Sequence, residues 1–440
     1  MFSINKWQKG KWTNWSESYV AYPSAIYTPN SIEEVCEILK QHVENKRTLR
    51  VTGAAHSFSP VAMPEQSAMS LHNLRGLIEV DQEAQTATFY AGTYLHEVGP
   101  LLEAHDFALI NMGDIQEQTL AGAISTGTHG TGVTLGSFSS MVTKWGFVNG
   151  KGEYIEHERG SDDLSKALHV SLGLLGILVK VTLKVIPLYS LAYTSERKSL
   201  NQELATFQNA IRENRHVEWF YFPSSDTIQV KKMNMLPVQK QNAWEKRIDE
   251  MKLQLIENNL FSFASKLVRT KPSYGLAVSK LSAQLISEGE RIGICYEIYP
   301  SPRAVKFVET EYAIPLASFE ACIEEVHAMF KRKQFDVHFP IECRTSAGEE
   351  GFLSPTQGVE SAFIAFHMYK GMDESAYFNW VHETMERYGG RPHWGKVNRY
   401  DASNIESFYP DVKIFNTIRK QHDPEGVFLT GYFKRIFQHL

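Results

Sequence analysis

The hydrophobic and polar positions of the first part of the chain switch between helical and strand spacing. Ser31-Ile-Glu-Glu34 has the pattern of a capping box, and apolar residues then recur at helical spacing up to Val43. Apolar residues in 77–81 and 85–92 have the spacing of strands, and 95–105 returns to helical spacing. These alternating elements predict a mixed α and β region in the N-terminal half.

The pattern changes near Pro187. Before it the chain is rich in glycine and tight turns, whereas residues 190–335 carry longer amphipathic helical patterns such as 318–335. A change of this kind indicates a domain boundary. The chain has 440 residues, more than most single domains, which also favours two domains. No internal repeat or low-complexity tract is visible.

Composition and charge exclude several classes of protein. Hydrophobic residues make up 43% and charged residues 22%, as in ordinary globular proteins and unlike disordered ones. A net charge of −5 gives no electrostatic reason to expect a nucleic-acid partner. The cysteines are widely spaced, so we expect reduced thiols and no cysteine metal site; they are Cys36, Cys295, Cys322 and Cys343.

The apolar segments of the chain predict neither a membrane protein nor a secreted protein. The first twelve residues lack the continuous apolar core of a secretory signal. The longest uncharged apolar run, 167–179, is too short and too interrupted to span a bilayer. We therefore expect a cytoplasmic protein without a membrane anchor.

Residues 50–60, Arg-Val-Thr-Gly-Ala-Ala-His-Ser-Phe-Ser-Pro, place a turn of very small residues directly before His56. Gly53 can adopt backbone angles closed to other residues, and Ala54 and Ala55 add little bulk, so a ligand could touch the main-chain N–H groups. His56 would then be the first reactive side chain that the ligand meets. The alternative is a tight turn whose histidine is hydrogen-bonded to nearby backbone.

A second glycine-rich segment runs from Gly113 to Gly132. Its accessible N–H groups and its serine and threonine hydroxyls could hold a pyrophosphate. It matches neither the G-x-G-x-x-G pattern nor a Walker motif, because Val133 stands where the Walker lysine would follow. A set of tight turns is the alternative.

Two later segments carry charged side chains in close spacing. Glu342 and Arg344 would project from the same face of a strand, either as a solvated ion pair or as a site for substrate hydroxyls and developing negative charge. Residues 391–398 gather His393 and Lys396 around a glycine, an unusual density for a plain surface loop, which is nonetheless the alternative.

Together these segments resemble the vanillyl-alcohol-oxidase type of FAD flavoprotein, and within it the sugar-lactone and alditol oxidases. The resemblance covers roughly residues 10–186 and 337–440 and is weak between them. Five segments carry it: Trp12-Thr-Asn-Trp15, the turn from Gly53 to Ser57, the loop from Gln118 to Gly132, His393-Trp-Gly-Lys396, and Asp423-Pro-Glu-Gly-Val-Phe428.

The resemblance implies an α+β, two-domain flavoprotein. An FAD-binding domain of the vanillyl-alcohol-oxidase type would span 1–187, an α+β substrate-binding cap 188–390, and a segment returning to the flavin 391–440. The implied reaction is hydride transfer to flavin N5 from an aldonolactone, such as L-gulono- or D-arabinono-1,4-lactone, or from an alditol. O₂ would be the acceptor and give hydrogen peroxide. A dehydrogenase with another acceptor and a non-catalytic flavin-binding protein are the alternatives.

The resemblance also assigns roles to individual residues. Glu342, Arg344 and Lys396 would be catalytic, and His367 and His393 would bind substrate, although a hydrogen-bonded core histidine is an alternative for His367. His56 would be joined covalently to the 8α-methyl group of the flavin, in a turn where Ala54 and Ala55 replace glycines of many relatives. The other residues assigned to FAD are Thr52, Gly53, Ala54, Ala55, Ser57, Gly113, Asp114, Thr119, Gly122, Ser125, Gly127, Thr128, His129, Gly130 and Ile177. No metal is expected.

Overall fold

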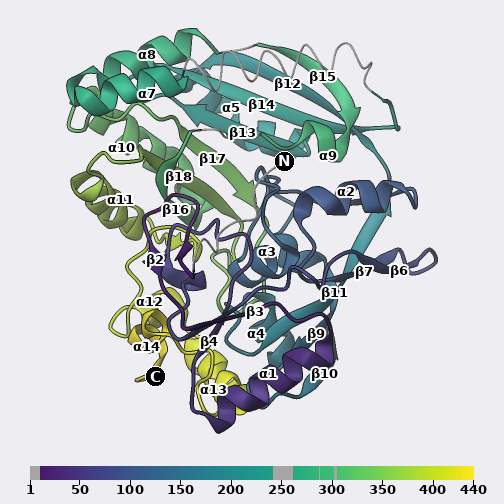
Figure 1. Cartoon of the computed structure of the whole chain (residues 1–440). Coiled ribbons are helices and arrows are strands. Elements are labelled where there is room, and N and C mark those ends of the chain that lie inside the picture. Colours follow the sequence, from purple (N-terminus) through teal and green to yellow (C-terminus); the bar gives the residue numbers. More distant parts are fainter. Residues whose placement is uncertain (1–9, 241–260, 287, 302–304) are drawn as a thin grey trace.

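The computed structural model describes residues 10–240, 261–286, 288–301 and 305–440 (Figure 1). Residues 1–9, which form most of the segment judged not to be a secretory signal, lie outside these ranges. None of the helices in the described ranges is both long and apolar enough to cross a membrane. The four cysteines are unpaired.

The first layer is a small parallel sheet of order β3-β5-β4, formed by Ala25–Tyr27, Ser67–Met69 and Leu49–Val51. Helix α1 (Ile32–Glu44) follows β3, and its cap confirms half of the predicted capping box. The Ser31 hydroxyl accepts the N–H of Glu34, whereas the Glu34 carboxylate accepts from the N–H of Asn30 at 2.7 Å. Strand β4 leads directly into the turn that ends on His56, and a hairpin of β1 (Trp12–Thr13) and β2 (Val20–Ala21) precedes the sheet.

The second layer is an antiparallel sheet of order β10-β9-β11-β7-β6, with β8 paired to β11. The strands predicted at 77–81 and 85–92 are confirmed as β6 and β7, and the helix predicted at 95–105 as α2. The bounds are Leu77–Asp81 (β6), Thr86–Tyr90 (β7), Phe107–Leu109 (β8), Val142–Val148 (β9), Tyr154–Glu158 (β10), Ile177–Pro187 (β11), Leu95–Glu103 (α2), Leu120–Thr126 (α3) and Asp163–His169 (α4).

The third layer is an antiparallel sheet of eight strands among the described residues, in the order β15-β12-β14-β13-β17-β18-β16-β19. Figure 1 shows it, in teal and green, above the N-terminal layers. The strands are Ser190–Ser199 (β12), His216–Tyr221 (β13), Thr227–Leu236 (β14), Gly289–Ile294 (β15), Phe307–Pro315 (β16), Ile341–Ser346 (β17), Ser361–Tyr369 (β18) and Arg391–Pro392 (β19).

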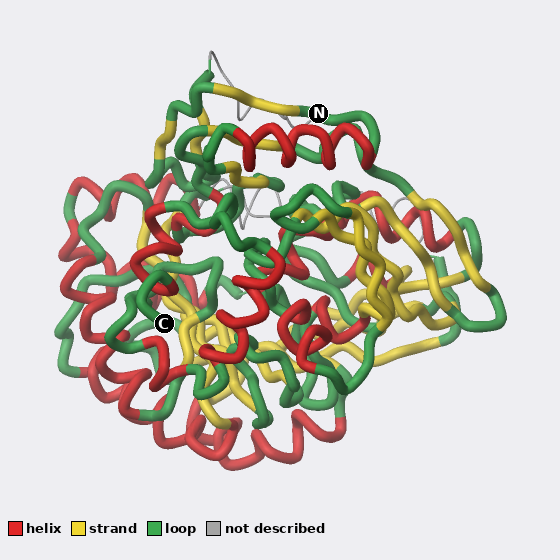
Figure 2. Tube along the Cα trace, turned by 90° about the horizontal axis from the view of Figure 1, so that it is seen from below, coloured by secondary structure: helices red, strands yellow, loops and turns green. Residues whose placement is uncertain are grey.

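Helices cover one face of this large sheet. Apolar side chains of α5 (Leu200–Glu213), α10 (Phe319–Lys331) and α11 (Ser375–Arg387) share a core with those of β13, β17 and β18. In the perpendicular view of Figure 2, helices lie along the lower edge of the molecule, outside the strands. The remaining helices here are α7 (Phe261–Thr270), α8 (Gly275–Gln284) and α9 (Cys295–Ile298), and short 3-10 helices lie at Pro60–Ala62, Phe138–Met141, Pro272–Tyr274 and Leu316–Ser318.

The C-terminal helices return to the first layer. They are α12 (Ile405–Phe408), α13 (Val412–His422) and α14 (Gly431–Phe437), in yellow in Figure 1 beside the purple N-terminal elements. The N–H of Leu49 in β4 donates to the carbonyl of Val427 at 2.9 Å. The fold is therefore α+β with a cap above a domain built from both ends of the chain. The proposed domain boundaries themselves stay predictions.

Candidate active site

The turn after β4 and the segment after β19 are hydrogen-bonded to each other. The N–H of Phe58 donates to the carbonyl of Gly395 at 2.6 Å, and the Ser59 hydroxyl donates to the carbonyl of Trp394, also at 2.6 Å. The Lys396 ammonium lies 5.2 Å from the centre of the Phe58 ring. Two motifs more than 300 positions apart in the sequence therefore form one structure.

The N-terminal Asn-Trp element packs on the same turn. The side-chain amide of Asn14 donates to the carbonyl of Ser57, and the N–H of Trp15 donates to the carbonyl of Ala55. The Trp15 ring meets the half-buried His56 ring edge-on at 5.0 Å. These contacts fix the chain on both sides of His56.

A cavity opens between this turn, helix α3 and the loop that leads into β11. It encloses about 930 Å³, including solvent at its open side. Ten of the sixteen residues assigned to FAD line it: Thr52, Gly53, Ala54, Ala55, His56, Ser57, Thr119, Gly122, Ser125 and Ile177.

The properties of this cavity fit FAD. Small residues keep it open: a Cβ atom on Gly53 would lie 2.5 Å from the Thr119 hydroxyl oxygen, so a larger residue would displace that lining. Its walls offer hydroxyl groups such as that of Ser125 and contain no carboxylate among the described residues. A roomy site with hydroxyl donors and no negative charge suits a flavin dinucleotide with its anionic diphosphate.

The other six residues assigned to FAD do not line this cavity: Gly113, Asp114, Gly127, Thr128, His129 and Gly130. Gly127 ends α3 with a φ of +73°, a left-handed conformation that favours glycine. A Cβ on Gly130 would lie 2.0 Å from the Met112 carbonyl oxygen, so this glycine allows two backbone segments to pack closely. Asp114 and His129 instead reach the large sheet.

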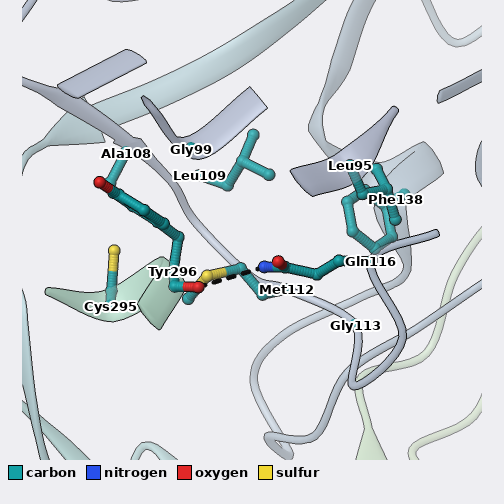
Figure 3. A pocket seen from close by; sticks show the side chains of 10 residues that line it. All are labelled: Leu95, Gly99, Ala108, Leu109, Met112, Gly113, Gln116, Phe138, Cys295 and Tyr296. Carbon is teal, nitrogen blue, oxygen red and sulfur yellow. Dashed lines mark hydrogen bonds between the residues drawn. The ribbon is translucent and has the colours of Figure 1, made fainter. Parts of the chain in front are cut away.

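A smaller cavity lies beside Gly113, between α2, β8 and α9 (Figure 3). Its lining is mainly apolar, and the side-chain amide of Gln116 crosses it to donate to the Tyr296 carbonyl at 3.2 Å. None of its described lining residues carries a charge, so it offers nothing to hold an anionic ligand. It is lined by Leu95, Gly99, Ala108, Leu109, Met112, Gly113, Gln116, Phe138, Cys295 and Tyr296.

The face of the large sheet opposite its helices carries buried charges. Glu342 and Arg344 project from β17 on one face and form an ion pair, as their spacing predicts. Arg344 also contacts Glu218 at 2.7 Å and Asp114 at 3.7 Å. Burial opposes its charge, but Glu218 and Asp114 raise the pKa of Arg344 above its ordinary value. Since Glu342 is only 4% exposed, the alternative of a solvated ion pair is wrong.

Lys396 and His367 meet at a residue that the sequence analysis did not single out. The carboxylate of Glu309 in β16 lies 2.6 Å from the Lys396 ammonium and 3.7 Å from Nε2 of His367. Nδ1 of His367 lies 3.1 Å from the Pro340 carbonyl oxygen. His367 is thus both a buried strand histidine bonded to backbone and a neighbour of the charged cluster.

Glu311, two residues further along β16, holds a second histidine. Its carboxylate lies 3.4 Å from Nε2 of His129, whose Nδ1 is 2.8 Å from the Gly130 carbonyl and whose ring stacks on Phe363 at 3.5 Å. His393 lies close by, and burial lowers its pKa to about 4.

These three side chains offer donor atoms within 4.8 Å of one another, near enough to hold a cation. However, Nδ1 of His393 already accepts the N–H of Gly395, and Glu311 is already paired with His129. We therefore interpret His129, Glu311 and His393 as a hydrogen-bonded cluster.

The sequence contains a weak signal for Glu309 and Glu311. In Val-Glu-Thr-Glu-Tyr, residues 308–312, the carboxylates recur with the two-residue spacing that singled out Glu342 and Arg344. Strand pairing then brings Glu311 and Glu342 opposite Ala365 from its two sides. This pairing places the charges of Glu309, Glu311, Glu342 and Arg344 on one face of the sheet. It depends on how the strands align in the fold.

Ala55 is expected to strain the turn before His56, because its φ of +51° is left-handed. Ala55→Gly should therefore raise the free energy of unfolding by about 1 kcal/mol, as relief of the Cβ clash outweighs the added freedom of the unfolded chain. Denaturant unfolding measures this effect.

Ala54 provides the matched control, because its φ is not positive. Ala54→Gly gains no relief and should lower the free energy of unfolding by about 0.5–1 kcal/mol. Equal changes in the two variants would contradict the assigned strain.

Comparisons with known proteins extend over nearly the whole chain. The family profile of D-arabinono-1,4-lactone oxidase matches residues 181–436, and that of an FAD binding domain matches residues 23–158. L-gulono-1,4-lactone dehydrogenase of Mycobacterium tuberculosis is 33% identical over 427 residues, which cover 97% of this chain and 98% of that protein. L-gulonolactone oxidase of Bos taurus is 28% identical, with coverage of 97% and 98%.

Among solved structures, cholesterol oxidase from B. sterolicum superimposes with a TM-score of 0.80. The alignment covers 97% of this chain and 96% of that one, at 16% sequence identity. At this identity the likeness shows a shared fold and says nothing of a shared substrate.

Proposed function

Since the chain belongs to the D-arabinono-1,4-lactone oxidase family and also carries an FAD-binding domain, we propose that it oxidises a sugar-derived lactone at an alcohol carbon with FAD as the immediate acceptor. One observation supports the site most directly. Hydrogen bonds from Phe58 and Ser59 to the segment before Lys396 join the wall of the FAD cavity to the charged face of the cap. A substrate there would contact both.

Bound FAD supplies the hydride acceptor, and the protein supplies orientation and charge. Glu342 accepts hydrogen bonds from substrate hydroxyls, which fixes the reacting carbon. Arg344 and Lys396 stabilise the alkoxide that the substrate hydroxyl forms when it loses its proton, or the negative charge that the reduced flavin gains with the hydride. Glu342 is buried and the Arg344 side chain is only 12% exposed, so this stabilisation is stronger than it would be in water.

His56 is proposed to join the 8α-methyl carbon of the flavin through a ring nitrogen, since it lines the cavity beside the tight turn. His367 and His393 are proposed to contact the lactone. The cytoplasmic location stays a prediction from the sequence.

Two candidate electron acceptors remain in the proposal. The resemblance to the sugar-lactone oxidases favours O₂, which gives hydrogen peroxide. The relative from M. tuberculosis, named a dehydrogenase, favours a non-oxygen acceptor. Rapid reaction of the reduced protein with air would support the oxidase, and slow reaction the dehydrogenase.

Anaerobic mixing of the holoprotein with a panel of aldonolactones and alditols tests the function. We expect L-gulono- or D-arabinono-1,4-lactone to bleach the flavin absorbance within seconds, followed by recovery on addition of the true acceptor. Dithionite serves as the control, because it should bleach the flavin whatever the substrate. Bleaching by dithionite but by no lactone or alditol would contradict the proposed function and favour a non-catalytic flavoprotein.

A further inference from the structure

Arg50 is the central residue of β4, the strand that leads into the turn ending on His56. It is 6% exposed, and its Nε donates to the Val61 carbonyl at 2.7 Å. A terminal nitrogen donates to the Leu172 carbonyl, and the guanidinium lies 4.6 Å from the centre of the Phe433 ring. The side chain therefore lies between the first layer, the loop before β11 and the C-terminal helix.

This buried cation has neutral neighbours. Among the described residues no carboxylate forms an ion pair with Arg50, whereas Arg344 contacts three of them. Burial lowers the pKa of Arg50 to about 9. A buried guanidinium without a counter-charge is costly, because hydrogen bonds to neutral carbonyls replace only part of its hydration.

A ligand in the FAD cavity could supply the counter-charge that Arg50 lacks. Arg50 lines the cavity, and among its described lining residues it is the one permanently charged side chain. The other lining residues are glycines, alanines, hydroxyl residues, apolar side chains, an amide and two histidines, His56 and His72. A ligand with negative charge would supply what the protein itself does not.

We propose that Arg50 provides the counter-charge for the diphosphate of FAD. The diphosphate is the one part of FAD that is anionic at neutral pH, since the isoalloxazine ring and the adenine are neutral. In a low-dielectric cavity this attraction is much stronger than in water. The assignment rests on FAD binding and does not depend on which lactone is oxidised.

Riboflavin, which has the flavin ring but no phosphate, separates the charge effect from a general effect on the cavity. Binding of FAD and of riboflavin would be measured by flavin fluorescence on the full-length apoprotein, in a His56→Ala background that keeps the flavin exchangeable. Arg50→Met should weaken FAD binding about 10- to 100-fold and change riboflavin binding less than about 3-fold. Arg50→Lys, which keeps the charge, should retain most of the preference for FAD.

Arg159 offers a matched control, because it also donates to two backbone carbonyls, those of Val142 and Ser139, and stacks on an aromatic ring, that of Trp145. It does not line the cavity. Arg159→Met should leave the ratio of FAD to riboflavin affinity unchanged.

Two results would overturn the proposal. One is an equal loss of FAD and riboflavin affinity in Arg50→Met, which would assign Arg50 a structural role. The other is an FAD affinity that the methionine substitution does not change. If Arg50→Met does not fold, as judged by circular dichroism, Arg50→Lys decides: loss of the preference for FAD in this folded, charged variant contradicts the proposal, and retention supports it.

Discussion

Arg344→Met is expected to lower the rate of flavin reduction by the lactone about 10³-fold and the free energy of unfolding by about 3–5 kcal/mol. The rate falls because the substitution removes the largely buried cation that we propose to act on the reacting oxygen. The stability falls because Glu342, Glu218 and Asp114 would remain buried around a neutral side chain. Anaerobic stopped-flow absorbance measures the rate, and denaturant unfolding measures the stability.

Arg344→Lys separates the two effects. Lysine keeps the charge and should restore most of the stability, but it lacks the planar fork that donates to several oxygens at once, so the rate should recover only in part. A methionine variant with the stability and the rate of the wild type would contradict the assigned role of Arg344.

His56→Ala is expected to convert a permanently yellow protein into one that loses all its flavin on denaturation. If a ring nitrogen of His56 is bonded to the flavin, acid precipitation of the wild type should leave fluorescent flavin in the pellet, while the variant releases it into the supernatant. Mass spectrometry of the intact chain provides a second readout, because the linked protein carries the added mass of FAD.

His72 gives a matched control, since this histidine lines the same cavity. His72→Ala should keep the flavin in the pellet. Release of all flavin from the denatured wild type would show that His56 is a neighbour of a non-covalently bound FAD, and the strained Ala55 beside it would then be the first residue to examine.

The elements that could be predicted from the sequence are those with one buried face. Helix α1 buries Val35 and Leu39 and exposes its other side, so its period is readable. Strand β18, by contrast, is buried at all of its positions from Ser361 to Tyr369, and no alternation remains to identify it. For this reason helical patterns in the cap and the strand of Glu342 and Arg344 could be predicted, but the strand order of its large sheet could not.

The candidate site divides in the same way. Glu342 and Arg344 could be paired because their partnership is local to one strand. The contacts of Arg344 with Glu218, and of Lys396 with Glu309, depend on how strands distant in sequence align, which spacing cannot give. Gly130 shows the converse case, since its place in a glycine-rich tract suggested an open anion loop whereas its backbone packs on Met112.

The hydrogen bonds from the turn after β4 to the carbonyls of Trp394 and Gly395 also set an order of events during biosynthesis. Ser59 emerges early from the ribosome, but the acceptor of its hydroxyl lies 335 residues later in the chain. Until Trp394 and Gly395 have been synthesised, the turn lacks these hydrogen bonds. Strand β4 likewise lacks its hydrogen bond to the carbonyl of Val427. The turn and β4 therefore acquire their full set of contacts only in the last stage of folding, after translation of nearly the whole polypeptide.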